Sequence, residues 1–120
     1  MKRCLVVDDV QVSQFALKQL LSEFQWKVSA VNSTAEAIDA LKRDSFDVLV
    51  ADWHLRQDSG LELIRVAKKE SGGRIVAIVI SGIEGAERAS VAREAGADGF
   101  VAKPASRDSL RQCLTSLRLI

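Results

Sequence analysis

Several residue types are scarce in this 120-residue chain, and each shortage excludes a class of protein. The chain has two cysteines, one histidine, one proline and no tyrosine. Cys4 and Cys113 lack the close spacing of zinc ligands and are too few for a disulfide framework, so we expect free thiols in a reducing, cytoplasmic setting. The lone histidine, His54, leaves no cysteine–histidine cluster that could bind a soft metal ion.

An excess of one charge and long hydrophobic runs are also missing. Lys plus Arg number 17 and Asp plus Glu number 16, which gives a net charge of +1, and the two signs are interspersed. This balance predicts no direct binding to nucleic acid or to acidic membranes. The longest apolar run, residues 75–80, is far shorter than the about 20 residues of a membrane span. The first apolar run stops at Asp8, too early for a signal peptide.

Short apolar runs alternate with helical patterns five times along the chain. The predicted strands are 4–7, 27–31, 48–51, 75–80 and 99–102. The predicted first, fourth and fifth helices cover about 11–24, 84–95 and 108 to about 119. The second helix is predicted to begin at 34 and the third at about 59. Five β-α units indicate an α/β fold, with a doubly wound parallel sheet covered by helices on both faces and one domain over 1–120. The helix over 84–95 has mostly alanine on its apolar side, so we expect it to be the most weakly anchored.

Polar side chains follow four of the five predicted strands. They are Asp8 and Asp9 after the first strand, Asp52 after the third, Ser81 after the fourth, and Lys103, before the only proline, after the fifth. Ligands of a doubly wound sheet bind outside the carboxyl ends of its strands. We therefore expect these side chains to meet at one edge of the sheet.

Three carboxylates at one edge repel one another unless a cation or a proton compensates their charge. Mg²⁺ prefers carboxylate, water and phosphate oxygens, and Lys103 and Ser81 are suited to bind oxygens of a phosphoryl group. The set therefore predicts a site built around a phosphoryl group on a carboxylate. The alternative is that Asp8 and Asp9 form an ordinary solvated turn and that Asp52 is a plain loop acid.

Four segments, in this order, resemble the receiver domain of response regulators in two-component signalling. They are the pair Asp8-Asp9, the segment 52–63 (DWHLRQDSGLEL), the pair Ser81-Gly82 and the segment 100–104 (FVAKP). The resemblance covers the whole chain. It implies a flavodoxin-like, CheY-like fold with five strands in the order 2-1-3-4-5.

The resemblance also implies roles for the charged residues. Asp52 would accept the phosphoryl group. Mg²⁺ would be held by Asp8, Asp9, Asp52 and the backbone carbonyl of His54. Lys103 would pair with Asp52 before phosphorylation and with a phosphoryl oxygen afterwards. A histidine beside a nucleophilic aspartate also suggests a general base, but we favour a surface side chain whose backbone serves the site.

Two switch residues and a cis peptide are implied in the same way. Ser81 would be the switch hydroxyl and Phe100 the switch aromatic, and the Lys103–Pro104 bond would be cis. Three positions depart from the common family pattern. Ser81 replaces threonine, Phe100 replaces tyrosine, and Arg56 replaces the proline often found four residues after the acceptor. The first two departures could weaken the coupling between phosphorylation and the output surface.

The function implied is a phosphorylation-driven signalling switch that catalyses only its own phosphorylation and dephosphorylation. A sensor histidine kinase or a histidine phosphotransfer protein would be the donor, and a downstream protein would bind the surface of the fourth helix, fifth strand and fifth helix. The charged start, Met1-Lys2-Arg3, favours a single-domain regulator over a receiver cut from a longer response regulator or hybrid kinase. Two other functions stay open: a phosphorylation-independent interaction module, and an aspartyl-phosphate phosphatase, although its haloacid-dehalogenase-like pattern needs Asp-x-Asp after the first strand.

Overall fold

The computed structural model of the chain describes residues 1–56, 58–83 and 85–120, in which five strands and five helices alternate. The elements are β1 (Arg3–Val7), α1 (Gln11–Ser22), β2 (Lys27–Val31), α2 (Thr34–Arg43), β3 (Val48–Asp52), α3 (Gly60–Glu70), β4 (Val76–Ser81), α4 (Ala86–Glu94), β5 (Gly99–Ala102) and α5 (Arg107–Ser116). The predicted strands are confirmed to within one residue at each end. The predicted start of the fourth helix, residue 84, lies outside the described residues.

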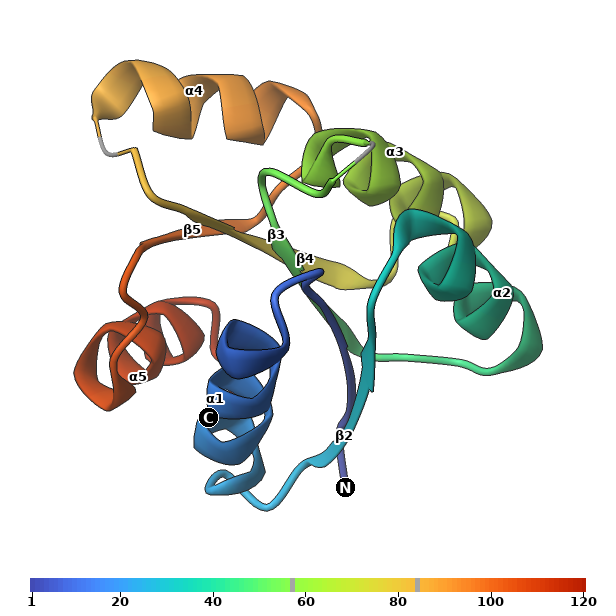
Figure 1. Ribbon diagram of the computed structural model, residues 1–120, viewed down its shortest axis with the longest axis horizontal. Coiled ribbons are helices and arrows are strands. Elements are labelled where there is room, and N and C mark those ends of the chain that lie inside the picture. Colours follow the sequence, from blue (N-terminus) through green and yellow to red (C-terminus); the bar gives the residue numbers. More distant parts are fainter. Residues whose placement is uncertain (57, 84) are drawn as a thin grey trace.

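The five strands form one parallel sheet in the order β2-β1-β3-β4-β5. Helices α1 and α5 cover one face, and α2, α3 and α4 cover the other (Figure 1). The predicted doubly wound α/β fold and its strand order are thus confirmed. The order reverses between β1 and β3, so the carboxyl ends of these two strands are neighbours, and a crevice at such a point is where ligands of this architecture bind.

Alternate strand residues face the two helical layers. In β1, Leu5 and Val7 belong to the core shared with α2 and α3, whereas Cys4 and Val6 belong to the core shared with α1 and α5. Because both faces of the sheet are covered, every residue of β3 is buried, which explains the uninterrupted apolar run before its last residue, Asp52. Among the described residues, none of the helices is both long and apolar enough to cross a membrane.

Serine side chains cap three of the helices. The Ser33 hydroxyl accepts the Glu36 N–H at the start of α2, as its sequence pattern predicts. The reciprocal half differs, because the Glu36 carboxylate accepts from the N–H of Asn32 rather than from that of Ser33. At α5, Ser106 and Ser109 form a complete capping box. These caps set where each chain segment leaves the carboxyl edge of the sheet and enters its helix.

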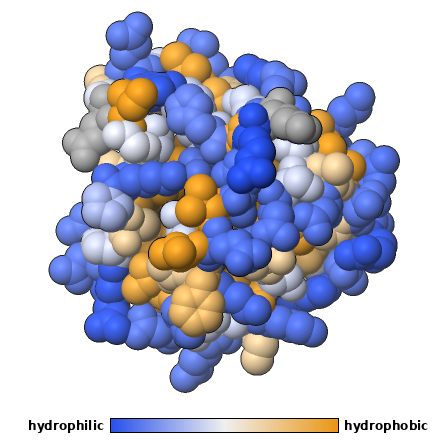
Figure 2. Space-filling model, viewed as in Figure 1, coloured by the Kyte–Doolittle hydropathy of each residue, from blue (hydrophilic) through white to orange (hydrophobic). Residues whose placement is uncertain are grey.

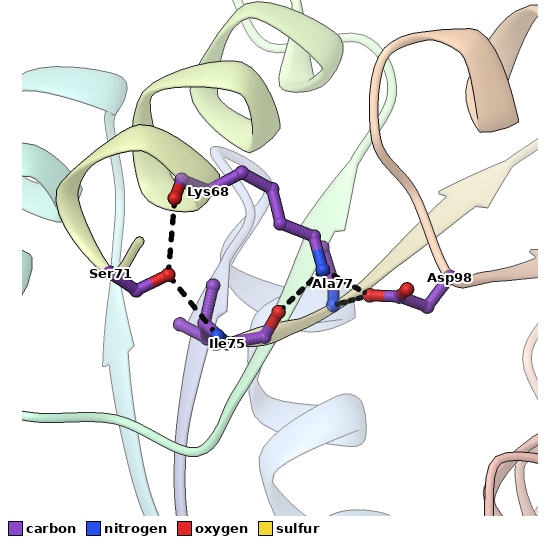
Figure 3. Close-up of polar contacts among 5 residues, drawn as sticks. All are labelled: Lys68, Ser71, Ile75, Ala77 and Asp98. Atoms are coloured by element: carbon purple, nitrogen blue, oxygen red, sulfur yellow. Dashed lines mark hydrogen bonds and ion pairs between the residues drawn. The ribbon is translucent and has the colours of Figure 1, made fainter. Parts of the chain in front are cut away.

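A polar network ties α3 to the amino ends of β4 and β5 (Figure 3). The Lys68 ammonium donates to the Ile75 carbonyl and to Asp98 Oδ2, both at 2.6 Å. The Ala77 N–H donates to the same Asp98 oxygen at 2.9 Å, and the Ser71 hydroxyl lies between the Lys68 carbonyl and the Ile75 N–H. This network fixes the segment between α4 and β5 at the sheet edge opposite the carboxyl ends.

Replacing the lysine of this network should destabilise the fold. Lys68→Ala leaves Asp98 and the Ile75 carbonyl without a charged donor, and such hydrogen bonds are worth roughly 1.5–3 kcal/mol. Since the Lys68 side chain is 22% exposed, we expect a loss near the lower end of that range in urea unfolding. Lys69→Ala, at the neighbouring exposed position of α3, is the matched control. Equal unfolding midpoints for the two variants would contradict a stabilising role for Lys68.

Candidate functional site

Asp52 is the last residue of β3 and is only 3% exposed. Its Oδ2 accepts a hydrogen bond from the Lys103 ammonium at 2.8 Å, and its Oδ1 accepts the His54 N–H at 3.2 Å. The ladder with β4 and the Trp53 N–H, which donates to the Ile80 carbonyl at 2.8 Å, hold the backbone on either side of the carboxylate. The predicted pairing of Lys103 with Asp52 is therefore present, although the two residues lie 51 positions apart in sequence.

Three carboxylates gather at this edge. One oxygen each from Asp8, Asp9 and Asp52 can be chosen so that all lie within 4.8 Å of one another. Asp8 is fully buried; its Oδ1 accepts the Val10 N–H at 2.9 Å, while its Oδ2 is buried with no hydrogen-bond partner in the described part of the chain. A buried, unpaired carboxylate oxygen beside two other carboxylates fits a hard divalent cation, which takes oxygen ligands.

The electrostatics of Asp8 reflect this crowding. Burial raises the pKa of its carboxyl group above the ordinary value of 3.8, and the charges of Asp52 and Asp9 act in the same direction. The Val10 N–H and the Lys103 ammonium oppose the rise. The carboxyl end of β1 is therefore a place where negative charge is costly unless a cation compensates it.

Two further residues hold the site in place, and the sequence analysis did not single them out. A Cβ at position 60 would lie 2.1 Å from the Asp52 carbonyl oxygen, so only glycine lets the start of α3 approach the end of β3 so closely. The Gln14 side-chain amide lies within hydrogen-bond distance of the Asp8 and Val31 carbonyls and of Asn32 Oδ1. A glycine opening a helix was a readable signal, but nothing in the sequence distinguishes Gln14 from a surface residue.

The predicted switch residues lie beside the acidic cluster. Ser81, the buried last residue of β4, donates its hydroxyl to the Ile83 carbonyl and accepts the Ile83 N–H, both at 3.1 Å. The half-buried Phe100 ring meets the Trp53 ring edge-on, with centroids 6.3 Å apart. The Lys103–Pro104 peptide is cis. The switch roles of Ser81 and Phe100, and metal binding by the His54 carbonyl, stay predictions.

Comparison with known proteins gives this geometry its context. A family model described as the response regulator receiver domain matches residues 4–115. The chain belongs to this family. The receiver is 34% identical over 121 residues to the regulatory protein VirG of Rhizobium rhizogenes, covering 98% of the chain and 49% of VirG. It is 30% identical over 118 residues to the sensory/regulatory protein RpfC of Xanthomonas campestris pv. campestris, covering 96% of the chain and 16% of RpfC.

The chain spans half or less of the length of these two curated relatives. Among solved structures, a response regulator from Burkholderia pseudomallei is 28% identical, with a TM-score of 0.85, and the match covers 99% of this receiver and 72% of that protein. The Burkholderia structure holds a phosphorylated aspartic acid, a calcium ion and citrate. The receiver therefore belongs to two-component signalling.

Without a divalent cation, Asp8→Asn should make the receiver more stable at neutral pH. Because the folded-state pKa of Asp8 is raised, the unfolded chain loses this proton first as the pH rises, and the charge then penalises the folded state. The penalty should be absent below pH 3.8 and complete above the raised pKa. Urea unfolding in EDTA at several pH values measures it.

Asp58→Asn, in the exposed loop before α3, is the control for a general charge effect. The stability gain from Asp8→Asn should exceed that of the control at pH 7, shrink as the pH falls through the raised pKa of Asp8, and be absent below pH 3.8. A gain that does not change with pH would argue against repulsion and burial as its cause.

Proposed function

We propose that the receiver is a phosphorylation-activated switch that accepts a phosphoryl group on Asp52. The observation that carries this proposal is the position of the Asp52 carboxylate, 2.8 Å from the Lys103 ammonium and within the cluster formed with Asp8 and Asp9. An Asp52 oxygen attacks the phosphorus of a phospho-histidine, the phosphorus–nitrogen bond breaks, and the imidazole leaves with a proton. Water later hydrolyses the acyl phosphate, which returns the carboxylate and releases inorganic phosphate. No outside substrate is turned over.

The receiver's own residues provide charge compensation for this transfer. Asp8, Asp9, Asp52 and the His54 carbonyl would hold Mg²⁺, which when bound neutralises the carboxylates and the transferring phosphoryl group. The unpaired, buried Oδ2 of Asp8 supports a cation at this place. Lys103 provides a second positive charge. Its ammonium contacts Asp52 Oδ2, whereas the His54 N–H contacts the other carboxylate oxygen, Oδ1.

The surface beside the site supports a protein as the donor. A hollow of about 440 Å³ lies between α1 and the connection from β5 to α5, with Asp8 and Lys103 among its polar lining and Leu17 among its apolar lining. On α1 next to it, Val12 is 80% exposed and Phe15 is 63% exposed. Figure 2 shows apolar side chains at the surface among hydrophilic ones on this face of the molecule. A helix of a sensor histidine kinase or of a histidine phosphotransfer protein suits this surface.

The output surface in this proposal consists of α4, β5 and α5. A hollow of about 470 Å³ lies on it, lined largely by small side chains that include Ala89, Ala92, Gly99 and Ser109. A downstream protein would bind there when phosphorylation changes the position of α4. The two free thiols, Cys4 and Cys113, support a reducing, cytoplasmic location.

Asp52→Asn should abolish phosphorylation by acetyl phosphate while leaving the fold intact, because it removes the nucleophilic oxygen but little volume. Asp58→Asn removes one carboxylate from the adjacent loop and should be labelled as the wild type is. Phosphate-affinity electrophoresis with and without Mg²⁺ measures both. Wild-type labelling of Asp52→Asn would show that another residue accepts the phosphoryl group.

Lys103→Ala should retain Mg²⁺ binding but lose the structural response. Removing the ammonium leaves the three carboxylates free of a positive charge that competes with the cation. The segment that follows β5 loses its side-chain hydrogen bond to the Asp52 carboxylate. Amide chemical shifts of α4 and β5, followed on addition of beryllofluoride and Mg²⁺, measure the response. Lys42→Ala, on an exposed position of α2, is the control. A full response in Lys103→Ala would exclude the lysine from signal transmission.

A further inference from the structure

The two ends of α4 are held in different ways. At its carboxyl end, Ala95 and Ala97 are buried, and Asp98 is fixed by Lys68 and by both backbone groups of Ala77. Along the helix itself, Ala92 is the one buried residue. At its amino end, Gly85 occupies the cap position with a φ of 130° and provides no side-chain cap. The carboxyl end of α4 is thus a fixed point, and the amino half has few packing contacts.

One side chain connects the amino half of α4 to the phosphoacceptor loop. The half-buried Arg88 guanidinium carbon lies 4.3 Å from the centre of the Trp53 ring, and a guanidinium nitrogen lies 3.5 Å from His54 Nε2. A guanidinium over an indole face is attracted by the ring quadrupole, and more strongly when the contact is partly desolvated. Trp53 is 6% exposed, so most of its ring is shielded from water.

Trp53 is itself immobilised next to the acceptor. It follows Asp52 directly, its N–H donates to the Ile80 carbonyl, and its carbonyl accepts the Gly60 N–H, both at 2.8 Å. Its ring also contacts Phe100 on β5. Trp53 therefore joins four elements: its backbone links the end of β3 to β4 and to the start of α3, and its ring contacts β5. In the described structure, Arg88 is the one charged side chain that reaches its ring from α4.

We propose that Arg88 is the positioning residue that clamps the amino half of α4 to Trp53 in the unphosphorylated receiver, with the Asp98 network as the pivot at the other end. The regulatory part of this inference rests on the proposed function. Negative charge added at Asp52 competes for the Arg88 guanidinium, which then leaves the Trp53 ring, so that α4 can pivot and change the lining of the output hollow. This connection runs from the acceptor to α4 without passing through Ser81.

The clamp is tested first without phosphorylation. In Arg88→Gln, hydrogen–deuterium exchange of the peptide covering 86–95 should be roughly five- to tenfold faster than in the wild type, the factor expected for losing one such contact. Exchange in α2 should not change. Arg88→Lys keeps the positive charge and should restore part of the protection. Arg93→Gln, on the same helix, is the matched control and should stay within twofold of the wild type.

A spectroscopic readout separates the clamp from a general effect on helix stability. In a Trp26→Phe background, Trp53 is the only tryptophan, and Arg88→Gln should shift its emission while Arg93→Gln should not. Exchange in Arg88→Gln within twofold of the wild type, or equal acceleration in Arg88→Gln and Arg93→Gln, would overturn the proposal. So would unchanged Trp53 emission in Arg88→Gln.

The regulatory step needs acetyl phosphate and Mg²⁺. In the wild type, phosphorylation should accelerate hydrogen–deuterium exchange of residues 86–95. In Arg88→Gln, phosphorylation should accelerate this exchange less than twofold further. Labelling of Asp52 in Arg88→Gln should stay at the wild-type level. Equal acceleration in both proteins would refute release of Arg88 as the regulatory step. An unlabelled wild type would instead refute the proposed function, and the measurements without phosphorylation would still decide whether the clamp exists.

Discussion

The ion pair between Lys103 and Asp52 lies where three carboxylates crowd the carboxyl edge of the sheet, and the local structure follows from that crowding. Asp8 is fully buried with one oxygen unpaired, and burial together with the neighbouring carboxylates raises its pKa. Lys103 compensates one negative charge of the group. The remaining negative charge supports the proposed divalent cation, and the phosphoryl group of the proposed function would add further charge for this cation and Lys103 to balance.

The fold concentrates this charge without placing it in the core. Asp8 directly follows β1, whose last four residues are apolar and buried, and Asp52 ends β3, whose other four residues are apolar and buried. The strand ladder therefore places both side chains at the edge of the sheet. The reversal of strand order puts β1 beside β3 and therefore Asp8 beside Asp52. The Gly60 backbone packs the start of α3 against the same edge, and the Gln14 side-chain amide ties α1 to it by donating to the Asp8 carbonyl. Rigid strands, rather than loops, thus set the distances between the charged groups.

The sequence predicted β1, β3 and β4 well because a strand buried on both faces appears as an apolar run, and the runs of β1 and β3 end at an aspartate. It predicted the helix ends less well, since α1 stops at Ser22, not at 24, and α5 stops at Ser116, not near 119. The pairing of Lys103 with Asp52 followed from strand-end positions and family resemblance. The contact of Arg88 with Trp53 could not be predicted from the sequence, because nothing in the sequence of a polar helix indicates which ring one of its arginines contacts. Contacts of long side chains depend on tertiary placement, which periodicity does not encode.

A switch needs one rigid part and one part whose position is decided by few contacts. Here β3 and β4 are fully buried or nearly so, whereas α4 buries a single alanine. In the proposed switch, two positions of such a helix would differ little in energy, and a change of charge at Asp52 would alter their populations. Larger apolar residues on α4 would increase its packing and hold it in one position. The alanine-rich face of α4 is therefore the property that, in the proposed function, would let a charge at the sheet edge change the α4-β5-α5 surface.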